Sequence, residues 1–174
     1  MDAFEWAHNA TDKLSTEFGS RLVFVGIQGS RARGEARDGS DIDLVVLLDH
    51  VDADDLARYH SVIQAMPHSE LACGFVGSER VLAAWPRHEL FQFYHDTAPL
   101  FGALPDVGPF SRDDALQAAS RAGRVQHAAS VAEFPHGFLR GAHPLFRCFH
   151  FGHGQGNGVV LRTAAHGVDQ RLAL

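Results

Sequence analysis

The sequence predicts an α/β domain, a small sheet with flanking helices, followed by a helix and an irregular tail. Up to about residue 104, short apolar runs rich in β-branched residues alternate with segments whose apolar residues recur every three or four positions. This alternation of strand and helix patterns is typical of the α/β class. Hydrophobic residues make up 45% of the 174 residues, enough to bury a core. After Phe134 neither period survives for more than a few residues.

The first elements are a helix and two buried strands. Apolar residues at helical spacing from Phe4 to Phe18 predict a helix, with Gly19 as its stop. The short runs RLVFVGI (21–27) and DIDLVVLL (41–48) each predict a buried strand. The segment between these strands is therefore a loop that returns the chain to the sheet.

The next helix is expected from about residue 53 to 66, because Asp52 can cap it and Pro67 ends it. The remaining elements of the domain are a strand, two short helices and an extended segment, at residues 70–76, 78–85, 87–96 and 98–104.

The chain is expected to have four parts: a domain, a linker, a C-terminal helix, and an irregular or incomplete helical appendage, at residues 1–104, 105–110, 111–134 and 135–174. Pro105, Gly108 and Pro109 predict the linker. Ser111 and Asp114 resemble a capping box at the start of the helix. For the last part the sequence leaves three explanations open: disorder, the remnant of a larger helical domain, and a shifted reading frame.

The charge balance and the N-terminus indicate the kind of protein. The formal net charge of −6 argues against broad binding of long nucleic acids. The N-terminus is charged from its second residue and lacks the apolar core of a signal peptide. No run approaches the roughly 18 apolar residues that a membrane span needs. We therefore expect a cytoplasmic protein, which associates with other copies if the thin apolar faces of 1–18 and 112–133 are exposed.

The segment GSRARGEARDGSDIDL (29–44) carries the candidate chemistry. Asp41 and Asp43 stand two residues apart at the entrance of a strand, so their side chains point to the same face. Two carboxylates at that distance repel unless a cation neutralises them. Mg²⁺ prefers oxygen ligands, and two such ions can clamp the attacking and leaving oxygens of an in-line displacement.

The other end of the segment is suited to phosphates. Gly29 allows a close approach of the backbone, and Ser30 begins a short helix whose N-terminal N–H groups and hydroxyl can donate. Arg31, Arg33 and Arg37 either meet phosphate charge or point to solvent. A Gly-Ser turn or an aspartate at a strand entrance is usually structural when it occurs alone, but their combination is much rarer.

This segment resembles the signature of the DNA polymerase beta-like nucleotidyltransferases, in particular their minimal form: Gly-Ser, about ten residues, then Asp-apolar-Asp. The resemblance implies a small mixed sheet with flanking helices and transfer of a nucleoside monophosphate from ATP or another NTP, with two Mg²⁺ ions and release of pyrophosphate. Gly29 and Ser30 would hold the triphosphate, and Asp41 and Asp43 the metals. Arg33 is a further candidate for nucleotide binding.

The family usually has a third carboxylate on a later strand, and Glu70 is the best placed candidate. The alternative is that Glu70 only caps the turn between helix and strand. The resemblance implies a protein or a small molecule as the acceptor, since small members of the family are often antitoxins that nucleotidylate a helical HEPN partner and others modify aminoglycosides. The rival hypothesis is a non-catalytic module that binds a nucleotide or a partner and has an incomplete C-terminal domain.

Overall fold

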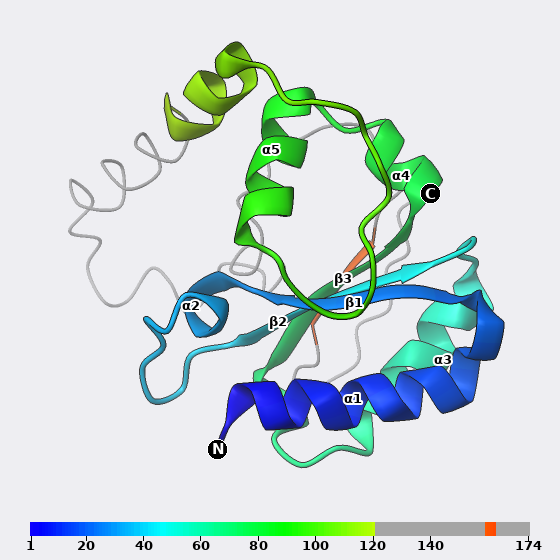
Figure 1. Cartoon of the computed structure of the whole chain (residues 1–174). Helices are drawn as coiled ribbons and strands as arrows, with labels where there is room; N and C mark the ends of the chain where they lie inside the picture. Colours follow the sequence, from blue (N-terminus) through cyan, green and yellow to red (C-terminus); the bar gives the residue numbers. More distant parts are fainter. Residues whose placement is uncertain (121–158, 163–174) are drawn as a thin grey trace, which may run out of the picture.

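The computed structural model describes residues 1–120 and the backbone of residues 159–162. Its centre is a mixed sheet with the strand order β4-β1-β2-β3-β5 (Figure 1). Strand β1 pairs antiparallel with β2 and β4, β2 pairs parallel with β3, and β3 pairs antiparallel with β5. The strands are β1 (Leu22–Gln28), β2 (Ile42–Leu48), β3 (Ala72–Ser78), β4 (Ala98–Gly102) and β5 (Val159–Arg162). The predicted α/β class is confirmed.

Helices cover both faces of this sheet. Helices α1 and α3 lie on one face, and α4 and α5 lie on the other (Figure 1). The α-helices are α1 (Ala3–Phe18), α2 (Gly29–Ala32), α3 (Ala53–Gln64), α4 (Glu79–Ala83) and α5 (Arg87–Asp96), and the 3-10 helices are η1 (Gly19–Arg21) and η2 (Ser69–Leu71). Residues 112–120 are also helical. No helix among the described residues is long and apolar enough to span a membrane.

The first core lies between the sheet and the pair α1 and α3. Ala7, Ala10 and Leu14 recur at helical spacing on α1 and are fully buried, and two alanines allow the helix to approach the sheet closely. The indole Nε1 of Trp6 donates to the carbonyl of Pro67 at 2.6 Å. This bond fixes the start of α1 to the segment that follows α3.

The second core is aromatic. Phe75, Trp85 and Phe93 meet edge to face, with ring centroids 5.1 to 5.9 Å apart. Such pairs stabilise a fold by about 0.5–1.5 kcal/mol each beyond the burial of their area. This cluster holds α4 and α5 against the sheet.

The segment predicted as a linker packs against this second core. Leu104, Val107 and Phe110 contact the aromatic cluster. Arg87 of α5 donates to the carbonyls of Val107 and Pro109, each at 2.6 Å, and its guanidinium lies 4.7 Å from the centre of the Phe110 ring. Residues 105–110 therefore form a strap over α5.

Two further differences from the sequence prediction concern the strands. Strand β3 begins at Ala72, two residues later than expected, because Ser69–Leu71 form the turn η2. Residues 159–162 form β5, although the sequence predicted no regular structure there. A run of four residues has too little pattern to be recognised, and its partner β3 is about eighty residues earlier in the chain. The helix predicted at 111–134 begins as expected, and its end lies outside the described residues.

A buried ion pair connects η1 to α3 beyond the C-terminal end of β2. Asp55 accepts hydrogen bonds from Nη1 and Nη2 of Arg21, both at 2.7 Å, and from the backbone N–H of Asp52 at 3.1 Å. Its side chain is only 2% exposed. The bond from Arg21 is the main reason why the pKa of Asp55 lies below its usual value.

We expect Asp55→Asn to destabilise the protein by about 1.5–3 kcal/mol at pH 7, the range for hydrogen bonds to charged groups. Because the folded pKa is depressed, this stabilisation is present above the unfolded pKa of about 4 and is lost as the pH falls below it. Urea unfolding at pH 7 and pH 3 measures the effect, with the exposed Asp54→Asn as the control. A difference that stays constant between the two pH values would contradict the ion-pair explanation.

Candidate functional site

The site begins at the corner where β1 passes into α2. Gly29 has a φ of +74°, in the left-handed region that favours glycine. A Cβ at this position would lie 2.1 Å from Oδ2 of Asp43. Cross-strand pairing of Gln28 with Asp43 brings the two together. Glycine is thus required twice, by the backbone conformation and by the carboxylate beside it.

The two aspartates form a charged pair next to this corner. Burial, and after it the nearby charge of Asp41, raise the pKa of Asp43 to about 6. Arg33 and Arg31 act in the opposite direction but do not cancel the shift. The local environment therefore disfavours the negative charge of Asp43, and a cation would relieve this cost.

The donor set fits a hard divalent ion. Asp41 and Asp43 offer carboxylate oxygens, the ligands that Mg²⁺ prefers. A second set of ligand atoms, from His50, Asp52 and Asp55, lies within 4.8 Å of one another beyond the other end of β2. The carboxylate of Asp55 already accepts from Arg21, and that of Asp52 caps α3. This second group is explained by the ion pair and the cap.

The loop between corner and aspartates contains the three arginines, which have different surroundings. Arg31 donates to the carbonyls of Ser40 and Asp41 at the end of the loop. Arg33 is 46% exposed and pairs with Glu35 at 2.9 Å and with Asp96 at 3.9 Å. The sequence singled out Arg33 as a candidate for nucleotide binding, but spacing alone does not tell which guanidinium turns back onto the loop.

Glu70 lies at the expected end of the sheet but not on a strand. It belongs to η2, its side chain is 53% exposed, and Oε1 lies 3.6 Å from Nδ1 of His68. Because β2 and β3 are parallel, η2 precedes β3 at the same end of the sheet at which Asp41 precedes β2. In register, the neighbour of Asp43 on β3 is Cys73. The role of Glu70 as third carboxylate stays a prediction.

Gln28 is a further residue at the site that sequence reasoning missed. It is 5% exposed, and Nε2 donates to the carbonyl of Phe93 at 3.1 Å and to Oγ1 of Thr97 at 2.5 Å. These bonds join the end of β1 to α5 and to the start of β4. A polar residue at the end of an apolar run was the available sequence signal, but its partners are about 65 residues further along the chain.

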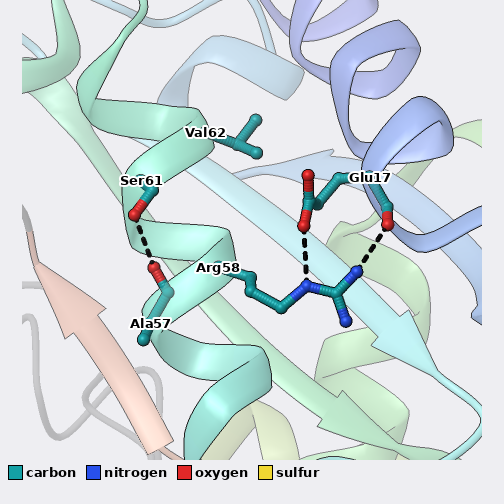
Figure 2. A pocket seen from close by; sticks show the side chains of 5 residues that line it. All are labelled: Glu17, Ala57, Arg58, Ser61 and Val62. Atoms are coloured by element: carbon teal, nitrogen blue, oxygen red, sulfur yellow. Dashed lines mark hydrogen bonds and ion pairs between the residues drawn. The ribbon is translucent and has the colours of Figure 1, made fainter.

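A surface depression lies elsewhere, between α1 and α3 (Figure 2). Arg58 spans it, donating from Nε to the Glu17 carboxylate at 2.6 Å and from Nη2 to the Glu17 carbonyl at 2.7 Å. Glu17 is close to the start of β1, whereas the Gly29 corner is at its end. The length of β1 therefore separates the depression from the aspartates, and its ion pair joins two helices.

A mixed sheet with helices on both faces, and a Gly-Ser corner whose glycine lies against the carboxylate of Asp43, fit the class of nucleotidyltransferases. The comparison with protein families agrees: residues 10–79 match the family model described as a nucleotidyltransferase domain. The chain therefore carries a nucleotidyltransferase domain, and the resemblance to the polymerase beta-like family is confirmed. No curated protein matches the chain.

Sixteen chains of solved structures match, with low identity. A chain of a toxin-antitoxin complex with AMP-PNP is 22% identical, over 71% of this chain and 90% of that one, with a TM-score of 0.39. A chain of the MntA-HepT toxin-antitoxin complex is 20% identical, over 72% and 90%, with a TM-score of 0.36. A chain from the complex of tri-AMPylated Shewanella oneidensis HEPN toxin with MNT antitoxin is 19% identical, over 73% and 90%, with a TM-score of 0.35.

Proposed function

We propose that this protein transfers a nucleoside monophosphate from an NTP, with ATP as the first candidate, to an acceptor in the cytoplasm. An oxygen of the acceptor attacks the α-phosphorus, the bond to the bridging oxygen breaks, pyrophosphate leaves and the acceptor loses a proton. The observation that carries this proposal is the contact between Gly29 and Asp43. Only a glycine leaves room for the carboxylate of Asp43 beside the corner, and Asp41 provides a second carboxylate near that of Asp43.

The residues of the site divide the work. Asp41 and Asp43 would hold Mg²⁺, which when bound offsets the negative charge of the phosphates and of the leaving pyrophosphate. Gly29 and Ser30 approach the triphosphate with their backbone and hydroxyl groups. Arg33 offers a half-exposed guanidinium next to Asp43, from which it can turn toward phosphate oxygens.

Glu70 completes the proposal as the group that takes the proton from the acceptor. This role is supported by the place of Glu70 in η2, at the end of the sheet at which Asp41 precedes β2. The exposed carboxylate of Glu70 would accept a proton from an acceptor that docks over this end. Proton transfer to a positioned carboxylate typically contributes about 10²–10⁴-fold to a rate.

For the acceptor we propose a helical HEPN-type protein, as in a toxin-antitoxin pair. This is the acceptor that the resemblance to small members of the family implies. One of the solved complexes described above contains an antitoxin and a HEPN toxin that carries AMP groups. A small-molecule acceptor such as an aminoglycoside is the alternative substrate for the same reaction.

The reaction is tested with ATP labelled at either the α or the γ position, together with Mg²⁺ and a candidate HEPN-type protein. We expect the α label to enter the acceptor and pyrophosphate to appear in equal amount. Transfer from the γ position alone would indicate a kinase-like reaction instead. ATP binding without pyrophosphate release, lost in the double variant Asp41→Asn/Asp43→Asn, would favour the non-catalytic module.

A further inference from the structure

The guanidinium of Arg31 closes the loop that leads to the aspartates. Arg31 lies in α2, directly after Ser30. Its Nε donates to the carbonyls of Ser40 and Asp41 at 3.0 and 3.1 Å, and its Nη2 donates to the carbonyl of Ser40 at 2.5 Å. These carbonyls are nine and ten residues further along the chain. One side chain therefore connects the phosphate end of the segment to its carboxylate end.

The two aspartates differ in how their backbone is held. Asp43 belongs to β2 and pairs with Gln28 on one side and Cys73 on the other. Asp41 precedes the first residue of β2, at the end of an exposed loop. Arg31 bonds to the carbonyl of Asp41 itself and to that of the residue before it. Hydrogen bonds from a charged donor are about twice as strong as neutral ones.

The same bonds distinguish Arg31 from the other arginines of the loop. Its Nε and Nη2 are already used by backbone carbonyls, and the side chain is partly buried. Arg33 pairs with carboxylates and is half-exposed. The exposed Arg37 bonds to Ser40 through its backbone: its N–H donates to Oγ of Ser40, and its carbonyl accepts from the N–H of Ser40. A phosphate would therefore find Arg33 more accessible than Arg31.

We propose that Arg31 is a positioning residue, which holds the backbone at Asp41 so that the carboxylate faces the Gly29-Ser30 corner. This inference rests on the proposed function, because it assigns Asp41 to the metal. Residues that orient a metal ligand typically change metal affinity or activity by about 10–100-fold when they are mutated.

The test measures Mn²⁺ binding to the full chain by electron paramagnetic resonance, with and without ATP. We expect Arg31→Ala to weaken Mn²⁺ binding by about 10–100-fold, and Arg31→Lys to recover part of the loss, since an ammonium can bond to one carbonyl. Arg37→Ala is the matched control and leaves the affinity unchanged. In the transfer assay, Arg31→Ala raises the Mg²⁺ concentration needed for half-maximal rate, while KM for ATP at saturating Mg²⁺ changes little.

Each of the other outcomes contradicts either the inference about Arg31 or the proposed function. An Arg31→Ala protein that unfolds at the wild-type temperature and binds Mn²⁺ like the wild type overturns the inference. A defect confined to KM for ATP overturns it in favour of direct phosphate binding. If Arg31→Ala does not fold, wild-type Mn²⁺ affinity of Arg31→Lys overturns it. If the wild type binds Mn²⁺ but transfers no nucleotide, the proposed function is contradicted and the inference about Arg31 is not. If the wild type binds no Mn²⁺ even with ATP, both are contradicted.

Discussion

Asp41→Asn and Asp43→Asn will each lower the rate of nucleotidyl transfer by about a thousandfold or more. A thousandfold loss corresponds to about 4 kcal/mol of transition-state stabilisation. A bound metal stabilises the charge that develops in the transition state by several kcal/mol, so a loss of this size is expected. An asparagine keeps the shape of the side chain but removes the negative charge. Pyrophosphate release, measured over a range of Mg²⁺ concentrations, tests the expectation. A variant that regains the wild-type rate at high Mg²⁺ would show that its carboxylate contributes affinity for the ion alone.

The same substitution at Asp43 should make the metal-free protein more stable. Burial and the neighbouring Asp41 raise the pKa of Asp43 to about 6, so its ionised form is disfavoured in the folded state. Because one pKa unit corresponds to about 1.4 kcal/mol and the pKa rises from 3.8 to about 6, we expect a gain of up to about 3 kcal/mol in the free energy of unfolding. This gain is complete above about pH 6 and disappears below about pH 4, where wild-type Asp43 is protonated in both states. Urea unfolding of metal-free protein measures it, and a loss of stability at pH 7 would show that the fold itself needs this carboxylate.

Gly29→Ala will lower the transfer rate by about a hundredfold or more and will destabilise the protein. The added Cβ would lie 2.1 Å from Oδ2 of Asp43, so the carboxylate must move or the corner must open. A misplacement of about 1 Å at a reacting group can cost about 10²-fold in rate. The left-handed conformation at φ +74° costs a further 1–2 kcal/mol or so in stability for an L residue. Steady-state rates and thermal unfolding of the same preparations check the two parts.

Gly34→Ala is the matched control for this prediction. Gly34 has nearly the same φ, +72°, and nothing lies within 4 Å of a Cβ placed there. It therefore carries the conformational cost without the collision with Asp43. We expect a similar loss of stability and a transfer rate within a few-fold of the wild type. If both variants lose activity equally, backbone strain in the loop would explain the defect, and the contact with Asp43 would not.

The parts of the site that sequence could predict depend on short-range geometry. Asp41 and Asp43 were recognised because residues two apart in a strand share a face. The first helix followed from the spacing of its apolar residues between Phe4 and Phe18, and the cap at Asp52 followed from the residue type. Each of these rules connects residues a few positions apart, so the sequence contains both partners of the relation.

The relations that sequence did not predict connect distant residues or depend on how a flexible side chain turns. Gln28 finds its partners on α5 and at Thr97, and β5 pairs with a strand about eighty residues earlier. The strap at 105–110 looked like a linker from its prolines and glycines, but Arg87 and the aromatic core hold it in place. Composition shows that such a segment is irregular without showing what it packs on.

The sequence by itself determined the class of protein and the chemistry of its site, because Gly-Ser, a loop of ten residues and Asp-Ile-Asp form one continuous segment. Only the tertiary structure decided how that segment is used. It packed the Asp43 carboxylate into the space that Gly29 leaves, raised the pKa of Asp43 through burial, and turned Arg31 back onto the loop while Arg33 stayed half-exposed. The physical reason is that burial and close contact depend on the pairing of β1 with β2 and on what packs around it, whereas the order of residues fixes only which groups can take part.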